Sequence, residues 1–143
     1  YMRHIGAVCV IPVLENGDVL VERQYRYPVG QVLTEIPAGK LDRRDEDRLL
    51  AAQRELREET GAEAGEWTSL GLFYPACAYS DEAIEMFLAR GIRFGERHLD
   101  KDEFLNVTRM PLAALLEAVM AGEVPDAKTQ IAVLKAARLL GLR

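Results

Sequence analysis

The sequence is poor in cysteine and in long apolar runs, and each shortage excludes a class of protein. Its two cysteines, Cys9 and Cys77, form neither a C-x-x-C pair nor a zinc-binding pattern, so we expect reduced, buried thiols. No apolar run approaches the roughly 18–20 residues that a membrane-spanning helix needs. The start, YMRHIGAVCV, lacks the charged segment and long apolar stretch of a signal peptide. These absences predict a cytoplasmic protein with no membrane partner.

Basic charge is not in excess either. The 143 residues hold 18 lysines and arginines against 23 aspartates and glutamates, a net charge of −5. Proteins that bind nucleic acid generally present a basic face, so we expect no nucleic-acid partner. The apolar and charged fractions, 49% and 29%, are those of a soluble globular protein. Without a repeat or linker, we predict one domain over residues 1–143, and the initial tyrosine directly before a strand leads us to expect a trimmed or partly ordered product.

The order of strand-like and helix-like segments predicts an α+β protein with a mixed sheet and helices on its faces. Asn16-Gly17 predicts a type I′ hairpin turn, because both central positions of that turn need φ > 0. Asp126 is placed to be the N-cap of the last helix. Strands are expected over 6–14, 19–26, 34–39, 83–90 and 104–111, and helices over 48–60, 111–122 and 126–141.

The helix expected over 48–60 carries a crowd of negative charge in the stretch RELREETG. Gly61 is well placed as its C-cap. The carboxylates of Glu55, Glu58 and Glu59 share an arc of about 100° on a helix of 3.6 residues per turn. This arc lies beside the expected apolar face, which is formed by Leu49, Ala52 and Leu56.

Two interpretations of the glutamates remain open on the residues alone. A charged helical face is usually just solvated, and Arg54 can pair with Glu58 at i,i+4. Alternatively, the carboxylates bind a hard divalent cation, since Mg²⁺ and Mn²⁺ prefer oxygen ligands. The glycine turn before the helix, ending at Gly39, favours the cation, because a glycine lets backbone approach a ligand closely.

With its flanks, the helix resembles the Nudix box, whose pattern is G, five residues, E, seven residues, R-E, an aliphatic residue, one residue, E-E, one residue, G and an aliphatic residue. The sequence departs from it in two places: six residues separate Gly39 from Glu46, and Ala62 is smaller than the usual aliphatic residue. The first departure puts the role of Glu46 in doubt. The matching positions are Arg54, Glu55, Leu56, Glu58, Glu59 and Gly61.

The stretches RQYRYPVG, EIPAGKLD and YPACAYSDEAIEMFLA are similar to the members of this family that cleave ADP-ribose and related sugar nucleotides. The resemblance implies a Nudix α/β/α sandwich that hydrolyses the diphosphate of a nucleoside diphosphate derivative. The first choice is ADP-ribose, cleaved to AMP and ribose 5-phosphate. The alternatives are a Nudix enzyme for another NDP-sugar or a dinucleotide, and a module that binds ADP-ribose without cleaving it.

The resemblance also implies roles for individual residues. Glu55, Glu58 and Glu59, with the Ala38 carbonyl, are the expected ligands of Mg²⁺ or Mn²⁺, and Arg54 is expected to orient the glutamates.

Around this centre, Arg26 is the expected phosphate or ribose contact, because its guanidinium matches phosphate oxygens, and an ordinary charge at a strand edge is the alternative. Glu35 and Glu82 are the other expected substrate contacts, although a structural role for Glu35 is equally open. Four aromatic residues are candidates to stack on adenine, with the core as their alternative place: Tyr25, Tyr27, Phe73 and Tyr74.

Water attack on phosphorus needs a proton acceptor that is not committed to metal. In the family this group often comes from an acidic loop before the last strand, which here reads HLDKDEFLNV. Glu103 is the predicted general base, with Asp102 and then Glu82 as alternatives.

Relatives of this kind are commonly homodimers, so a homodimer is expected.

Overall fold

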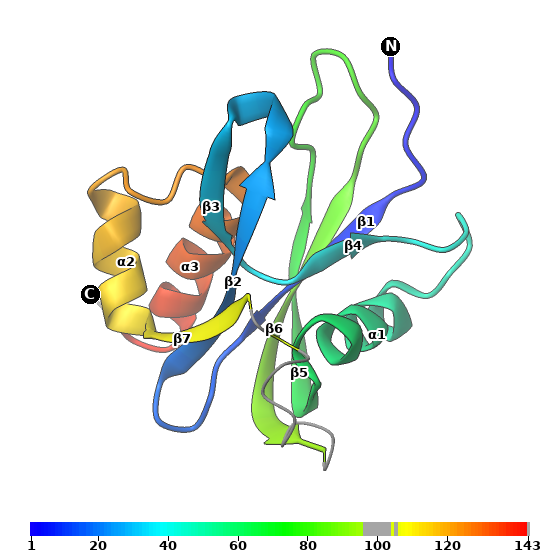
Figure 1. The fold of residues 1–143 in the computed structure, drawn as a ribbon. Helices are drawn as coiled ribbons and strands as arrows, with labels where there is room; N and C mark the ends of the chain where they lie inside the picture. Colours follow the sequence, from blue (N-terminus) through cyan, green and yellow to red (C-terminus); the bar gives the residue numbers. More distant parts are fainter. Residues whose placement is uncertain (96–103, 105, 143) are drawn as a thin grey trace.

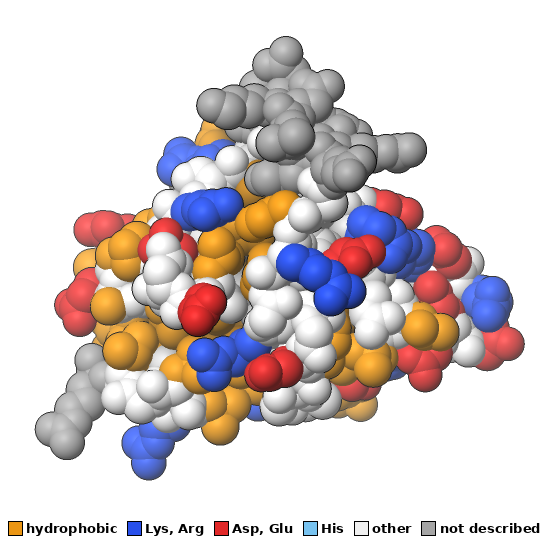
Figure 2. Space-filling view, turned by 90° about the horizontal axis from the view of Figure 1, so that it is seen from below, with side chains coloured by type: hydrophobic (Ala, Val, Ile, Leu, Met, Phe, Trp, Pro, Cys, Tyr) orange, Lys and Arg blue, Asp and Glu red, His pale blue; other side chains and the backbone are white. Residues whose placement is uncertain are grey.

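The computed structural model describes residues 1–95, 104 and 106–142, and it has the α+β architecture expected from the sequence (Figure 1). Its strands are β1 (Ala7–Pro12), β2 (Asp18–Arg26), β3 (Gln31–Glu35), β4 (Ala38–Lys40), β5 (Ala62–Phe73), β6 (Ile84–Phe94) and β7 (Val107–Pro111). Its helices are α1 (Arg48–Thr60), α2 (Leu112–Met120), α3 (Ala127–Leu139) and the short 3₁₀ helix η1 (Tyr27–Val29). No helix in these ranges is long and apolar enough to cross a membrane. On the face shown in Figure 2, acidic, basic and hydrophobic side chains lie next to one another.

The strands form two sheets rather than the one that the sequence suggested. The first is mixed and has the order β4-β1-β6-β5, with β1 and β6 parallel. The second has the order β3-β2-β7 and is antiparallel throughout. The strand expected over 34–39 is divided between them at Ile36-Pro37. Pro37 has no N–H to donate, so a continuous ladder through this position is not possible, and the chain passes from one sheet to the other.

Helices cover both faces of the mixed sheet. Val8 and Val10 of β1 belong to the same buried cluster as Leu56 of α1. Cys9 and Ile11, which point the other way, belong to a second cluster with Ala132 of α3. The sheet therefore lies between α1 on one side and α3 on the other, which is the expected sandwich (Figure 1).

Helix α1 begins and ends where its local signals place it. The side chain of Asp47 accepts a hydrogen bond from Leu50 N, and Gly61, at φ 73°, donates its N–H to Arg57 O. The expected apolar face is wrong at Leu49, which is exposed, whereas Ala51 is fully buried. The buried face of the helix is thus turned toward Glu55, which is itself buried.

Two further expectations are wrong. Among the described residues only glycines have positive φ, so Asn16 cannot belong to a type I′ turn. Instead Gly17, at φ 91°, donates its N–H to Leu14 O at 2.9 Å. The turn therefore runs from Leu14 to Gly17, and the glycine at its end supplies the positive φ. Cys77 is exposed, because it lies in the irregular stretch between β5 and β6 rather than in a strand.

Candidate functional site

The functional site is built where α1 lies against β4. A Cβ atom added to Gly39 would lie 2.1 Å from Cδ of Glu55, far inside van der Waals contact. Gly39 therefore makes room for the Glu55 carboxylate. The role expected from the sequence was different, namely the close approach of backbone to a ligand.

Arg54 holds the carboxylate of Glu55 from the other side. Its Nη1 donates to Glu55 Oε1 at 2.7 Å, and its Nη2 donates to Glu46 Oε1 at 3.2 Å. Glu46 is fixed in turn by a 2.7 Å hydrogen bond from Asp42 N, so the extra residue in its loop does not keep it away from Arg54. The i,i+4 contact of Arg54 with Glu58 is longer, at 3.7 Å, and Glu58 is exposed. Arg54 thus contacts Glu55 and Glu46 more closely than Glu58, and its expected role in orienting the glutamates stays a prediction.

Glu59 meets a carboxylate that the sequence analysis did not consider. Its Oε2 accepts a 3.2 Å hydrogen bond from Ala38 N, and its side chain is also hydrogen-bonded to Glu22 of β2. Burial, together with the neighbouring Glu22 carboxylate, raises the pKa of Glu59 to about 9, and burial also raises the pKa of Glu22. The two side chains therefore share a proton near neutral pH.

Burial, followed by the negative charge of Glu59, raises the pKa of Glu55 as well. Over the described residues, no three acidic, histidine or cysteine side chains are already gathered closely enough to hold an ion. The donor set nevertheless fits a hard divalent cation: Glu22, Glu55 and Glu59 are carboxylates crowded at the edge of the core, and a cation would relieve their mutual repulsion. Glu58 stands at the exposed rim of this group.

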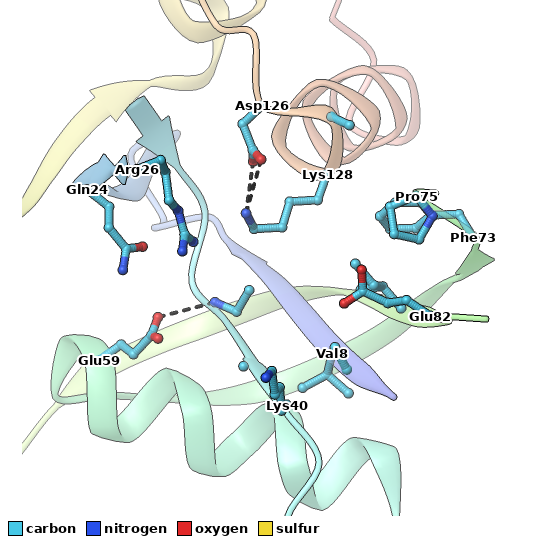
Figure 3. Close-up of a pocket in the computed structure, with 15 residues that line it drawn as sticks. Val8, Gln24, Arg26, Lys40, Glu59, Phe73, Pro75, Glu82, Asp126 and Lys128 are labelled. Atoms are coloured by element: carbon cyan, nitrogen blue, oxygen red, sulfur yellow. Dashed lines mark hydrogen bonds and ion pairs between the residues drawn. The ribbon is translucent and has the colours of Figure 1, made fainter. Parts of the chain in front are cut away.

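A cavity of about 410 Å³ opens beside these carboxylates (Figure 3). One part of its wall is acidic and includes Glu59, while Arg26 and Lys128 bring positive charge from β2 and α3. A small apolar wall is formed by Val8, Phe73 and Pro75 (Figure 3). The remaining lining residues are Ala7, Gln24, Ala38, Gly39, Lys40, Glu82, Ile84, Asp126 and Ala127.

Arg26 and Glu35, both expected at the substrate, have different positions. Arg26 lines the cavity, whereas Glu35 lies beneath it and is 1% exposed. Arg26 donates to Glu35 through Nε at 2.7 Å and Nη2 at 2.8 Å, and Lys128 Nζ donates to Glu35 Oε1 at 2.6 Å. Burial acts to raise the pKa of Glu35, but these hydrogen bonds outweigh it, so the pKa of Glu35 is lowered. Glu35 is thus the ionised partner of two cations.

Glu82 is at the apolar end of the cavity, and its Oε2 lies 3.1 Å from His4 Nε2. Of the four aromatic candidates, Phe73 lines the cavity, while Tyr25, Tyr27 and Tyr74 are exposed and therefore not core residues.

Glu103 and Asp102, the first two candidates for the general base, are outside the described residues. Phe104 and Asn106, which follow them, line a second cavity of about 190 Å³ together with Glu22 and Glu59.

Sequence analysis missed two residues of the site, Glu22 and Lys128. Strand alternation places Glu22, Gln24 and Arg26 on one face, so the assignment of Arg26 was a signal for Glu22. Lys128 had no comparable signal, because the contact of α3 with β3 joins residues far apart in the chain.

Known proteins resemble this chain in sequence and in fold. The NUDIX domain profile matches residues 2–131. An ADP-ribose pyrophosphatase of Bacillus subtilis (strain 168) is 40% identical over 134 residues, 92% of this chain and 72% of the relative. A methanol dehydrogenase activator of Bacillus methanolicus is 37% identical with the same coverage. A crystal structure described as an ADP compounds hydrolase has the same fold, with a TM-score of 0.80, 24% identity, and coverage of 95% of this chain and 72% of that one. The chain therefore belongs to the Nudix hydrolase family.

Proposed function

We propose that this protein hydrolyses ADP-ribose to AMP and ribose 5-phosphate. The observation that carries the proposal is a cavity with the carboxylate of Glu59 from α1 on one side and the guanidinium of Arg26 from β2 on another. A diphosphate has concentrated negative charge, so it needs cations on every side that it faces. The choice of ADP-ribose is supported by relatives named ADP-ribose pyrophosphatase, including one of Mycobacterium tuberculosis at 37% identity over 86% of this chain.

Nudix hydrolases generally need divalent metal ions. For this chain we propose Mg²⁺ or Mn²⁺, held by Glu55, Glu58, Glu59 and the Ala38 carbonyl, with Glu22 beside Glu59. The cation would offset the negative charge of the diphosphate and the charge that develops as its bridging bond breaks. Arg54 keeps Glu55 in place through the 2.7 Å hydrogen bond described above.

In the reaction, the oxygen of a water molecule bonds to one phosphorus atom, and the P–O bond to the bridging oxygen breaks. The bridging oxygen leaves with the other phosphate, and a carboxylate accepts the proton of the water. On sequence grounds Glu103 remains the proposed acceptor. Arg26 is the proposed phosphate contact, and Glu82, at the apolar end, is the proposed contact for a ribose or the base.

A panel of nucleoside diphosphate derivatives tests this function. ADP-ribose, a GDP-sugar and a dinucleoside polyphosphate are incubated with the protein and Mg²⁺, and the products are separated by chromatography. We expect AMP and ribose 5-phosphate from ADP-ribose at the highest kcat/KM, with one ¹⁸O atom from labelled water in a single product. Faster cleavage of another compound in this panel would show that ADP-ribose is not the preferred substrate. Binding of ADP-ribose without any cleavage would contradict the proposed hydrolysis and would indicate a module that only binds ADP-ribose.

A further inference from the structure

The buried carboxylate of Glu35 joins two cations that come from different parts of the fold. Arg26 is at the end of β2, Glu35 ends β3, and Lys128 is in the first turn of α3. Glu35 Oε1 is shared, because it accepts from Arg26 Nη2 at 2.8 Å and from Lys128 Nζ at 2.6 Å. The second oxygen, Oε2, accepts from Arg26 Nε at 2.7 Å. The position of the Glu35 carboxylate therefore depends on both cations.

The contact with Glu35 determines which edge of Arg26 faces the cavity. A guanidinium has five N–H donors, and Glu35 takes two of them on the Nε side. The remaining donors belong to the outer edge, which is left for the cavity that Arg26 lines (Figure 3). That edge has the fork geometry that matches two oxygens of a phosphate.

Lys128 is held more firmly than Arg26. Its side chain is 12% exposed, against 44% for Arg26. Its Nζ also lies 3.1 Å from a carboxylate oxygen of Asp126, the N-cap of α3 (Figure 3). Asp126 in turn accepts from the hydroxyl of Thr129 at 2.6 Å, and that hydroxyl accepts from Ile36 N at 3.0 Å. Lys128 is thus fixed to α3, which is itself tied to the residue after Glu35.

We propose that Lys128, acting through Glu35, is a positioning residue that holds the free edge of Arg26 toward the substrate. Only the identity of the substrate in this inference depends on the proposed function. Without Lys128, the Glu35 carboxylate keeps one cation and can turn with Arg26, so the guanidinium loses its fixed direction. The main effect falls on substrate binding, because the hydrogen bonds of Lys128 and Glu35 described above go to Arg26, to Asp126 and to each other, and not to the carboxylates proposed to bind metal.

The first test measures the position of Arg26 without any substrate. The Nε–H resonance of Arg26 is identified by its loss in Arg26→Gln, and its exchange with solvent is followed by ¹⁵N NMR. In Lys128→Met we expect exchange roughly tenfold faster, the size expected when a charge-assisted network loses a partner. Lys135→Met is the matched control, because Lys135 is also on α3 and donates at 2.6 Å, but to Leu70 O outside the cavity. Unchanged exchange in folded Lys128→Met would overturn the proposal.

The second test is a double-mutant cycle on KM, run with whichever nucleoside diphosphate derivative the wild-type protein cleaves best. We expect Lys128→Met to raise KM about tenfold with kcat within about twofold, from the loss of one well-oriented charged contact. In an Arg26→Gln background the same change should alter KM less than about twofold, because the two residues act as one unit. A full effect in that background would show that Lys128 acts independently of Arg26 and would overturn the proposal.

Folding is checked by circular dichroism, and Lys128→Gln, which keeps an N–H donor, replaces the methionine variant if that variant does not fold. The two tests also separate this inference from the proposed function. If ADP-ribose is not cleaved, the function fails, while the exchange measurement still decides the role of Lys128. If ADP-ribose is cleaved but the cycle is additive, the function stands and the inference fails.

Discussion

At the scale of single residues, Gly39 has the sharpest steric requirement. Its φ is not positive, so alanine would fit the backbone, and the three atoms nearest to a new Cβ, the closest at 2.1 Å, all belong to the Glu55 carboxylate. We predict that Gly39→Ala displaces the Glu55 carboxylate and lowers kcat roughly 100-fold, the penalty that a shift of about 1 Å can produce. Gly95→Ala is the control, because no atom of the described residues lies within 4 Å of its Cβ position. Steady-state kinetics with equal activity in both variants would contradict the assignment of Glu55.

A second prediction for single residues concerns Glu55 and Glu59, two glutamates of the Nudix box. Glu55→Gln and Glu59→Gln each remove a proposed metal ligand, so kcat should fall by orders of magnitude, about 100-fold or more. The melting temperature should not fall, since glutamine keeps the size of each side chain and can replace protonated Glu59, while at Glu55 it also removes a charge from a crowded group. Kinetics at saturating Mg²⁺ and thermal unfolding measure the two effects. Near-wild-type turnover in either variant would remove that residue from the metal site.

Glu59 also predicts how stability depends on pH when EDTA removes metal. Its pKa rises from 4.5 to about 9, so the folded state holds a proton that the unfolded state releases. The resulting stabilisation is fully present below pH 4.5 and is lost as pH rises toward 9. We therefore expect the melting temperature to decline over this range, and to decline less in Glu59→Gln than in Glu117→Gln, which alters an exposed glutamate of α2. Parallel curves for the two variants would show that Glu59 does not retain this proton.

At the scale of elements, the cap of α1 gives a prediction about stability. The Asp47 side chain accepts from Leu50 N at 3.0 Å, and its loss should lower the free energy of unfolding by about 1 kcal/mol. Urea denaturation of Asp47→Ala measures this. Asp45→Ala is the control, because Asp45 is exposed and its ion pair is with the exposed Arg43 in the same loop. Equal midpoints for the two variants would contradict the capping role.

Elements with local signals were predictable from the sequence. The bounds of α1, the Gly61 cap and the Asp126 cap follow from residues within one helical turn. The division of 34–39 between two sheets was not predictable, because strand pairing joins residues distant in sequence. The site follows the same rule: RELREETG identified the carboxylates of α1, whereas Glu22 and Lys128 reach the site only through tertiary packing.

At the scale of the whole molecule, we propose the homodimer that the family resemblance implies. The hairpin of β2 and β3, with η1 at its tip, presents large apolar side chains to solvent at Tyr25, Tyr27, Val29 and Val32, which are 60%, 85%, 55% and 50% exposed. Tyr25 and Val32 are cross-strand partners, and alternation along β2 turns Tyr25 away from the cavity that Gln24 and Arg26 line. Exposed apolar patches of this kind mark interaction surfaces.

The dimer prediction is tested by light scattering at micromolar concentration. We expect twice the chain mass of 16.0 kDa, and a shift toward one chain mass in Tyr27→Ser combined with Val32→Ser, because the contact would lose its apolar side chains. Met120→Ser is the control, since Met120 is equally exposed but lies on α2. Arg26 lies between Tyr25 and Tyr27, so loss of the dimer should also loosen the end of β2 and raise KM. A single chain mass for the wild-type protein, or a dimer that survives the double substitution, would exclude this hairpin as the interface.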